Sequence, residues 1–183
     1  VAEAQRVLKQ ERGQEIPDSR CFSGFDAYKK LLDSGVDLVL HATPPHFRPM
    51  HMAAVVDAGK HLFMEKPVSV DVPGALAVMQ TAERAASRGL SIMTGTQLRR
   101  DLARMEVRKR ILDGAIGDIR ALRFIRNQGA LWYRVPQDGW SDMEYMIRDW
   151  VNWAWLSGDI IVEQHIHHLD ASMWVLGKAP VNA

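Results

Sequence analysis

The sequence predicts an α/β fold in which a parallel sheet is followed by the start of a second α/β domain. Between residues 36 and 112, short aliphatic strands alternate with segments of helical spacing. Units of this kind build parallel sheets through crossover helices. After Gly117 a longer strand-like run precedes a stretch rich in tryptophan. This change of character places a domain boundary near residue 115, between predicted parts 1–115 and 116–183.

The elements of the first part follow from residue type and spacing. Runs of aliphatic and β-branched residues predict three short buried strands, at 36–40, 61–64 and 91–94. Helices are expected where apolar residues recur three or four residues apart and a glycine follows as a stop signal. These helices cover residues 2–11, 25–32, 47–58, a segment capped by Asp71 and closed by Gly89, and 102–112.

The second part is expected to begin with a strand and to end with a helix. Residues 119–126 are predicted to form a longer strand, and 159–176 a helix that Gly177 stops. Between them, residues 130–155 hold five of the six tryptophans with few regular signals. We expect a long loop or insertion there, and long ordered loops are often functional.

Composition and charge limit the partners and the cellular location that we expect for this protein. A formal net charge of +1 over 183 residues gives no electrostatic reason to expect nucleic acid or a membrane as partner, and no apolar run has the length of a membrane span. The single Cys21 forms no internal disulfide and fits a reducing compartment. A cytoplasmic location is therefore expected. Because the chain opens with Val1, we expect its true N-terminus, with any export signal, to lie upstream.

Two basic clusters lie in or beside the helix predicted at 102–112. Arg99 and Arg100 precede this helix. Arg108, Lys109 and Arg110 lie within it, with acidic residues nearby. We predict that both clusters form a solvated face and not a binding surface.

Two motifs follow predicted strands. Glu65-Lys66-Pro67 comes after the strand at 61–64, and Ala42-Thr43-Pro44-Pro45-His46 comes after the strand at 36–40. In open α/β sheets the ligand crevice lies at the carboxyl ends of the strands, where a lysine ammonium would stand over it. Each motif alone is also consistent with a plain turn, one with a surface charge pair and the other with two prolines.

Ionisable residues form a stripe along the predicted last helix. Glu163 and His167 are four residues apart, so their side chains are neighbours. A carboxylate beside an imidazole raises its basicity and orients it for proton transfer. The alternative is a partly buried polar stripe that pairs with another element. The stripe comprises Asp159, Glu163, His167, Asp170 and Trp174, beside an apolar stripe of Val162, Ile166, Leu169, Met173 and Leu176.

Together, the lysine and the His/Glu pair suggest one kind of chemistry. A lysine at a strand end and a pair on a helix of the next part could face each other across a cleft. Such a constellation suits the oxidation of an alcohol, in which a base takes the hydroxyl proton, a cofactor accepts hydride and a cation stabilises the developing alkoxide.

The sequence resembles the glucose–fructose oxidoreductase and inositol dehydrogenase family, often called Gfo/Idh/MocA. The resemblance runs from Asp37 to the end and rests on Asp37–His51, Ala58–Pro67 and Ser157–Gly177. It implies a partial Rossmann domain, a doubly wound parallel sheet, followed by the beginning of a substrate domain with a mostly antiparallel sheet. It also implies NAD or NADP as cofactor, a small carbohydrate substrate such as a sugar or polyol, and a homo-oligomer.

The resemblance assigns roles to particular residues. Lys66 would lie between the nicotinamide and the substrate hydroxyl, and His167 would be the general acid/base. Glu163 stands where the family usually has aspartate, and we expect it to orient His167. Residues expected near the cofactor are Thr43, Pro44, His46, Glu65, Lys66 and Gln97. Trp132, Tyr133 and Arg148 are candidate substrate contacts, chosen for their place in the aromatic insertion.

The sequence departs from the family pattern at both ends, so the given chain by itself is not expected to carry out the whole reaction. The glycine-rich phosphate-binding loop would belong upstream of residue 1, and much of the substrate-domain sheet would follow Ala183.

Two alternatives to the dehydrogenase remain open. One is a metal-dependent hydrolase or isomerase that uses the His165–His168 cluster with Glu163 and Asp170, although histidines two apart share a face on a strand and not on a helix. The other is a non-catalytic relative that binds a sugar or a protein.

Overall fold

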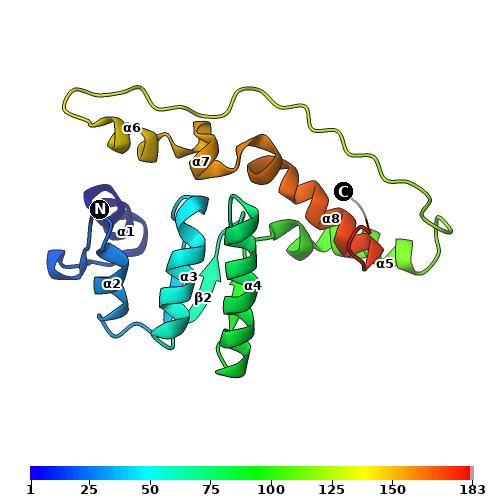
Figure 1. The fold of residues 1–183 in the computed structure, drawn as a ribbon, viewed down its shortest axis with the longest axis horizontal. Coiled ribbons are helices and arrows are strands. Elements are labelled where there is room, and N and C mark those ends of the chain that lie inside the picture. Colours follow the sequence, from blue (N-terminus) through cyan, green and yellow to red (C-terminus); the bar gives the residue numbers. More distant parts are fainter. Residues whose placement is uncertain (182–183) are drawn as a thin grey trace.

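Three parallel strands form the centre of the first part in the computed structural model, which describes residues 1–181 (Figure 1). Their order is β1 (Leu38–His41), β2 (His61–Met64), β3 (Ile92–Thr94), with Leu38 opposite His61 and Leu62 opposite Ile92. The predicted parallel sheet is confirmed. All three carboxyl ends therefore lie at one edge, where the two strand-end motifs begin.

Helices connect the strands as crossovers, as the sequence predicts. Asp71 accepts a hydrogen bond from the backbone N–H of Gly74 and caps α4, and Asp101 caps α5 in the same way through Arg104. The elements of this part are α1 (Ala2–Arg12), η1 (Asp18–Arg20), α2 (Ala27–Leu32), η2 (Pro45–Phe47), α3 (Arg48–Asp57), α4 (Val72–Ser87), η3 (Gln97–Arg100) and α5 (Leu102–Leu112).

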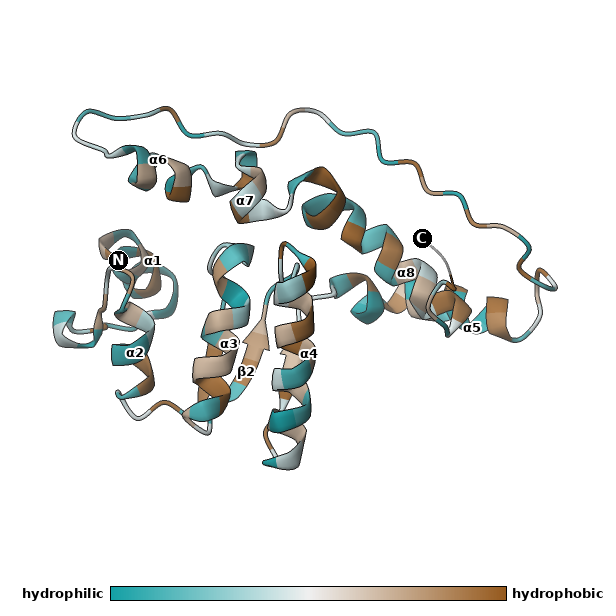
Figure 2. Ribbon diagram, viewed as in Figure 1, coloured by the Kyte–Doolittle hydropathy of each residue, from teal (hydrophilic) through white to brown (hydrophobic). Residues whose placement is uncertain are grey.

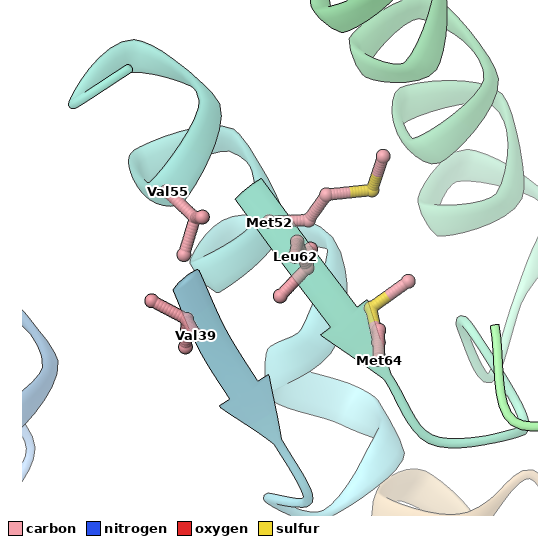
Figure 3. Close-up of a cluster of buried hydrophobic side chains, with 5 residues drawn as sticks. All are labelled: Val39, Met52, Val55, Leu62 and Met64. Carbon is pink, nitrogen blue, oxygen red and sulfur yellow. The ribbon is translucent and has the colours of Figure 1, made fainter. Parts of the chain in front are cut away.

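The core of this part lies between α3 and the strands β1 and β2 (Figure 3). Leu62 and Met64 alternate with less buried residues along β2, so one face of that strand packs against the helix. Each such side chain contributes roughly 1.5–3 kcal/mol when it leaves water. This packing fixes the strand ends relative to the start of α3. The buried cluster comprises Val39, Met52, Val55, Leu62 and Met64.

The strand predicted at 119–126 is wrong. Residues 119–137 run as an extended segment with no helix or strand, passing outside the later helices in Figure 1. Hydrophobic and hydrophilic residues are mixed along it (Figure 2), but Arg120, Arg123 and Arg126 come at every third position and not with the period of two of a strand. A strand also needs a neighbour for its backbone hydrogen bonds, and the described residues provide none here.

The expected long loop at 130–155 is correct only for its first part. The later residues form α6 (Asp142–Arg148), η4 (Trp150–Asn152) and α7 (Ala154–Ser157). Ser141 caps α6 by accepting a hydrogen bond from the backbone N–H of Glu144. The buried Asp149 carboxylate accepts from the backbone N–H of Arg134 at 2.7 Å, which holds the extended segment against these short helices.

The last predicted helix is present, but it begins differently from the expectation. After α7, Gly158 and Asp159 both have positive φ, and a π-helical turn, η5 (Ile161–His165), leads into α8 (Ile166–Leu176). A β-carbon on Gly158 would lie 2.6 Å from Cβ of Val162, so only glycine fits at this corner. None of the helices among residues 1–181 is both long and apolar enough to cross a membrane.

Candidate functional site

The loops after the three strands converge at the carboxyl edge of the sheet. The backbone N–H of Glu65 donates to the carbonyl of His41, and that of Gly95 donates to the carbonyl of Met64, each at 2.9 Å. A β-carbon on Gly95 would meet the Glu65 carboxylate at 2.5 Å. Glycine at this position therefore leaves room for Glu65 beside the third strand end.

Lys66 projects from the end of β2 to the π-helical turn before α8. Its Nζ donates to the backbone carbonyl and to Oε1 of Glu163, both at 2.6 Å. The Lys66 side chain is 16% exposed and that of Glu163 is 9% exposed. Two residues that the sequence singles out, 97 positions apart, thus form a largely buried ion pair.

The surroundings of Glu163 act on its charge in opposite directions. Burial raises the pKa of the Glu163 carboxyl above its usual value, whereas the Lys66 ammonium and the charge of Arg48 lower it. Its second oxygen, Oε2, is buried and has no hydrogen-bond partner among the described residues. This carboxylate therefore retains an unused acceptor beside the lysine.

His167 lies one turn further along the chain, and the charge of Lys66 affects its pKa. Burial lowers the pKa of His167 below its usual value, and the positive charges of Lys66 and Arg126 lower it further. The neutral imidazole, which accepts protons, is favoured. The hydrogen bonds of Glu163 go to Lys66 and not to His167. The π-helical turn breaks the regular helical phase from which a Glu163–His167 contact was expected.

The expected cofactor residues on the first loop have well-defined neighbours. Thr43 Oγ1 lies 2.5 Å from His41 Nε2 and 3.3 Å from His51 Nδ1. Burial lowers the pKa of His41 to about 4, so this cluster is uncharged at neutral pH. Thr43 and Pro44 also line an apolar cavity of about 580 Å³ beside β1. His46 is exposed at the loop tip.

The remaining expected cofactor residues lie on the second and third loops. Glu65 accepts a hydrogen bond from the backbone N–H of Lys66 at 3.2 Å. Gln97 begins η3 with an exposed side chain, and its backbone N–H donates to the carbonyl of Gly95. The structure thus brings these residues to the same sheet edge as Lys66.

The three candidate substrate residues lie in the aromatic segment without a hydrogen bond to Lys66, Glu163 or His167 in the described chain. Trp132 packs edge-on against Trp150, with ring centroids 6.0 Å apart, and Tyr133 is 73% exposed. Arg148 pairs with Glu144 and lies over the Trp140 ring, 4.6 Å from its centroid.

Trp155 on α7 is an aromatic residue of this segment that contacts a strand-end loop, and it was not among the candidate residues predicted from the sequence. Its ring packs edge-on against His46, with centroids 5.2 Å apart. This contact brings the tryptophan-rich segment to the first strand-end loop. No sequence signal separates Trp155 from its four neighbouring tryptophans, because the contact joins elements distant in sequence.

The prediction of a solvated basic face is wrong for two of the five residues. The Arg99 guanidinium donates hydrogen bonds to both carboxylate oxygens of Asp170, at 2.7–3.0 Å. Arg108 donates to the carbonyl of Trp174 and lies over its ring. Both contacts join the region after β3 to α8. Arg100, Lys109 and Arg110 are exposed, as expected.

The histidine cluster of the metal alternative has another arrangement. The rings of His165 and His168 lie edge-on with centroids 6.0 Å apart, and His168 stacks on Phe124. Within residues 1–181, no group of three or more histidine, cysteine, aspartate or glutamate side chains is placed to hold a metal ion. The metal-dependent alternative therefore lacks a ligand set in the described part of the chain.

The sheet, its crossovers and the loops at its carboxyl edge define a dinucleotide-binding type of α/β protein. Residues 5–93 match the model of the oxidoreductase family Gfo/Idh/MocA with an NAD-binding Rossmann fold. This match confirms the resemblance to that family over the first part of the chain.

Similar proteins agree with this assignment. The chain is 28% identical over 153 residues to the scyllo-inositol 2-dehydrogenase (NAD(+)) of Bacillus subtilis, an alignment that covers 83% of this chain and 39% of that protein. It is 28% identical over 178 residues to the 2,7-anhydro-N-acetylneuraminate hydratase of Escherichia coli, an alignment that covers 95% of this chain and 43% of that protein.

A solved structure shares the fold. The crystal structure of myo-inositol 2-dehydrogenase from Lactobacillus plantarum superposes with a TM-score of 0.67 at 23% identity, covering 99% of this chain and 48% of that chain. The chain spans about two fifths of the length of the curated relatives it matches.

Proposed function

We propose that this chain is the central part of an NAD- or NADP-dependent dehydrogenase that oxidises a secondary alcohol of a small polyol or sugar. The observation that carries the proposal is the contact between Lys66 and Glu163 at the carboxyl edge of the sheet, with His167 four residues after Glu163 in the chain. The inositol dehydrogenase among the relatives supports a polyol substrate. Because the chain spans less than half of that relative, the activity is assigned to the protein made from the complete reading frame.

The residues at the strand ends fit the nicotinamide end of such a cofactor. They combine hydrogen-bonding side chains with the Lys66 ammonium, and the Glu163 carboxylate that pairs with this lysine has an oxygen without a partner among the described residues. The sequence contains no G-x-G-x-x-G motif for the pyrophosphate. Residues proposed to hold the nicotinamide end are Thr43, Pro44, His46, Glu65, Lys66 and Gln97.

The proposed reaction assigns one task to each side chain. The neutral imidazole of His167 removes the substrate hydroxyl proton, and the Lys66 ammonium donates a hydrogen bond to the oxygen as negative charge develops. Glu163 holds Lys66 in place through its carboxylate and its backbone carbonyl. A nicotinamide held by the strand-end residues would supply the hydride acceptor for the substrate carbon. Trp132, Tyr133 and Arg148 remain proposed substrate contacts.

The same proposal extends to assembly and location. We expect a homo-oligomer, which the family match and the exposed apolar side chains of Leu122, Phe124 and Ile125 support. A cytoplasmic location is supported by the one unpaired cysteine, Cys21.

The first experiment is to identify the cofactor and the reaction. Protein from the complete reading frame is denatured, and released dinucleotide is identified by mass spectrometry. Native protein is then given polyols and aldoses while the absorbance of reduced nicotinamide and the products are followed. Net substrate oxidation is expected, and product analysis separates it from hydration, the activity named for the Escherichia coli relative.

A pair of histidine variants tests the role of the site. His167→Ala is expected to lower turnover by about 10²–10⁴-fold, because a general base contributes that much. His165→Ala is the matched control from the same helix and is expected to keep most activity. Failure to release dinucleotide or bind added NADH or NADPH would refute the dehydrogenase proposal. Equal effects of the two variants would refute the role of His167.

A further inference from the structure

Arg48 is a buried cation that neither the family match nor the proposed reaction explains. It is the first residue of α3 and is only 2% exposed. Burial lowers the pKa of its guanidinium to about 10. Glu163 and Glu65 attract its charge, but within the described chain no carboxylate lies within ion-pair distance of it. Burying an arginine without such a partner is strongly unfavourable unless its donors are satisfied.

The donors of Arg48 are satisfied by the backbone of two strand-end loops. Its Nε donates to the carbonyl of Thr43 at 2.9 Å, in the loop after β1. Its Nη1 donates to the carbonyls of Glu65 at 2.8 Å and Pro67 at 2.6 Å, in the loop after β2. These two carbonyls flank Lys66, so the guanidinium holds the backbone on both sides of the lysine.

We propose that Arg48 is a positioning residue, which fixes Lys66 relative to the loop at Thr43 and thereby aims its ammonium into the site. A guanidinium presents several donors in one rigid plane, so it joins three carbonyls from two loops at once. A lysine in its place would keep the charge but lose the fixed fork. The geometry, more than the charge, is therefore the property that matters. This inference rests on the proposed function only in naming the reaction that Lys66 serves.

The test compares three variants of the protein from the complete reading frame. Arg48→Met removes charge and donors, and Arg48→Lys keeps the charge alone. Arg88→Met is the matched control, because Arg88 also donates to backbone carbonyls, but to those of Val56 and Asp57 at the other end of α3. Thermal melting establishes that each variant folds, and Arg48→Lys decides the question if Arg48→Met does not fold.

The first readout does not depend on activity. The rate at which an amine-acetylating reagent modifies Lys66 is measured by mass spectrometry relative to Lys60, the residue before β2. Both Arg48 variants are expected to raise this relative rate about tenfold, since a loosened loop releases Lys66 from its buried pair, while Arg88→Met leaves it unchanged. An unchanged rate in a folded Arg48 variant overturns the proposal.

The second readout is kinetic. Both Arg48 variants are expected to lower kcat by about 10²-fold, a loss typical of a misplaced catalytic group, with a smaller change in cofactor KM. Full activity in Arg48→Lys would show that the charge alone suffices and would also overturn the proposal. If the unaltered protein oxidises no alcohol, the proposed function fails, and the labelling rates still decide whether Arg48 positions Lys66.

Discussion

Two pairs of a cation and a carboxylate join the last helix to the sheet part, and they differ in burial and in geometry. In the Lys66–Glu163 pair the side chains are 16% and 9% exposed, and one carboxylate oxygen lacks a partner among the described residues. In the Arg99–Asp170 pair they are 38% and 16% exposed, and the guanidinium binds both oxygens.

The difference separates a contact that docks two elements from a contact that we propose to serve a ligand. Arg99 and Asp170 satisfy each other in the flat bidentate arrangement that suits this pair. Glu163 is more buried but less satisfied, which costs stability. A structure that only needed to hold the helix would do better with the first arrangement, so the second supports the proposed site, in which a substrate group would complete the hydrogen bonding of Glu163.

The largest expected effect concerns the two cations. Lys66→Met is expected to lower turnover by about 10²-fold or more, because the developing oxyanion loses its cationic donor. Arg99→Met is the control, and it is expected to stay within about threefold of the unaltered protein, since partly exposed ion pairs contribute little. Turnover is measured with saturating cofactor. Equal losses of turnover in the two variants would contradict the conclusion that the two ion pairs have different roles.

Lys66→Met is also expected to change the titration of His167. The positive charge of Lys66 lowers the pKa of His167, so removing that charge raises the pKa and leaves more imidazolium at a given pH. The imidazole resonances of His167 report this shift by NMR even when turnover is lost. A fall in the pKa of His167 would contradict the placement of Lys66 beside it.

A smaller effect is expected from glycine substitutions at the two ends of the last helix. Gly158→Ala forces a β-carbon into Val162 at positive φ, which costs about 1–2 kcal/mol for the backbone and about 1–3 kcal/mol for the overlap. Gly177→Ala has the same backbone problem but open space around the new atom. Denaturant unfolding should therefore show the larger loss for Gly158→Ala. Similar losses would mean that the π-helical turn adapts.

The smallest effect is expected for the docking pair. Asp170→Asn should cost about 1 kcal/mol of unfolding free energy, the upper range for a partly exposed pair. Because the Asp170 charge raises the pKa of His167, this variant should also lower that pKa, opposite in sign to Lys66→Met. NMR titration of His167 measures both signs in one experiment. Shifts in the same direction would contradict the arrangement of the two pairs around this histidine.

Much of the first part could be predicted because its signals are local. Alternating aliphatic strands, glycine stops and the Asp71 cap lie within a few residues of the elements they define. The strand ends, and with them the place of Lys66, followed from the rule that parallel strands point the same way. The prediction of a strand at 119–126 was wrong because residue types along the chain do not show whether a neighbouring strand is present, and the described residues provide none there.

The partners of the site residues could not be predicted in the same way. Lys66 was expected to face Glu163 and His167, but regular helical spacing assigned the carboxylate of Glu163 to His167. Gly158 and Asp159, both at positive φ, and the π-helical turn after them rotate Glu163 toward Lys66. Arg48 and Trp155 were not predicted as site residues, because each contacts a residue that is distant in the sequence: Glu65 for Arg48 and His46 for Trp155.

The sequence by itself determined the family resemblance, the parallel sheet and the chemical types of the residues at its carboxyl edge, since these depend on neighbours along the chain. Only the tertiary structure decided which donor meets which acceptor: Glu163 with Lys66, Asp170 with Arg99, and Arg48 with the carbonyls that flank Lys66. The reason is that a buried charge must find its partner in space, and the helix phase and loop path that bring the partner are set by packing between distant segments.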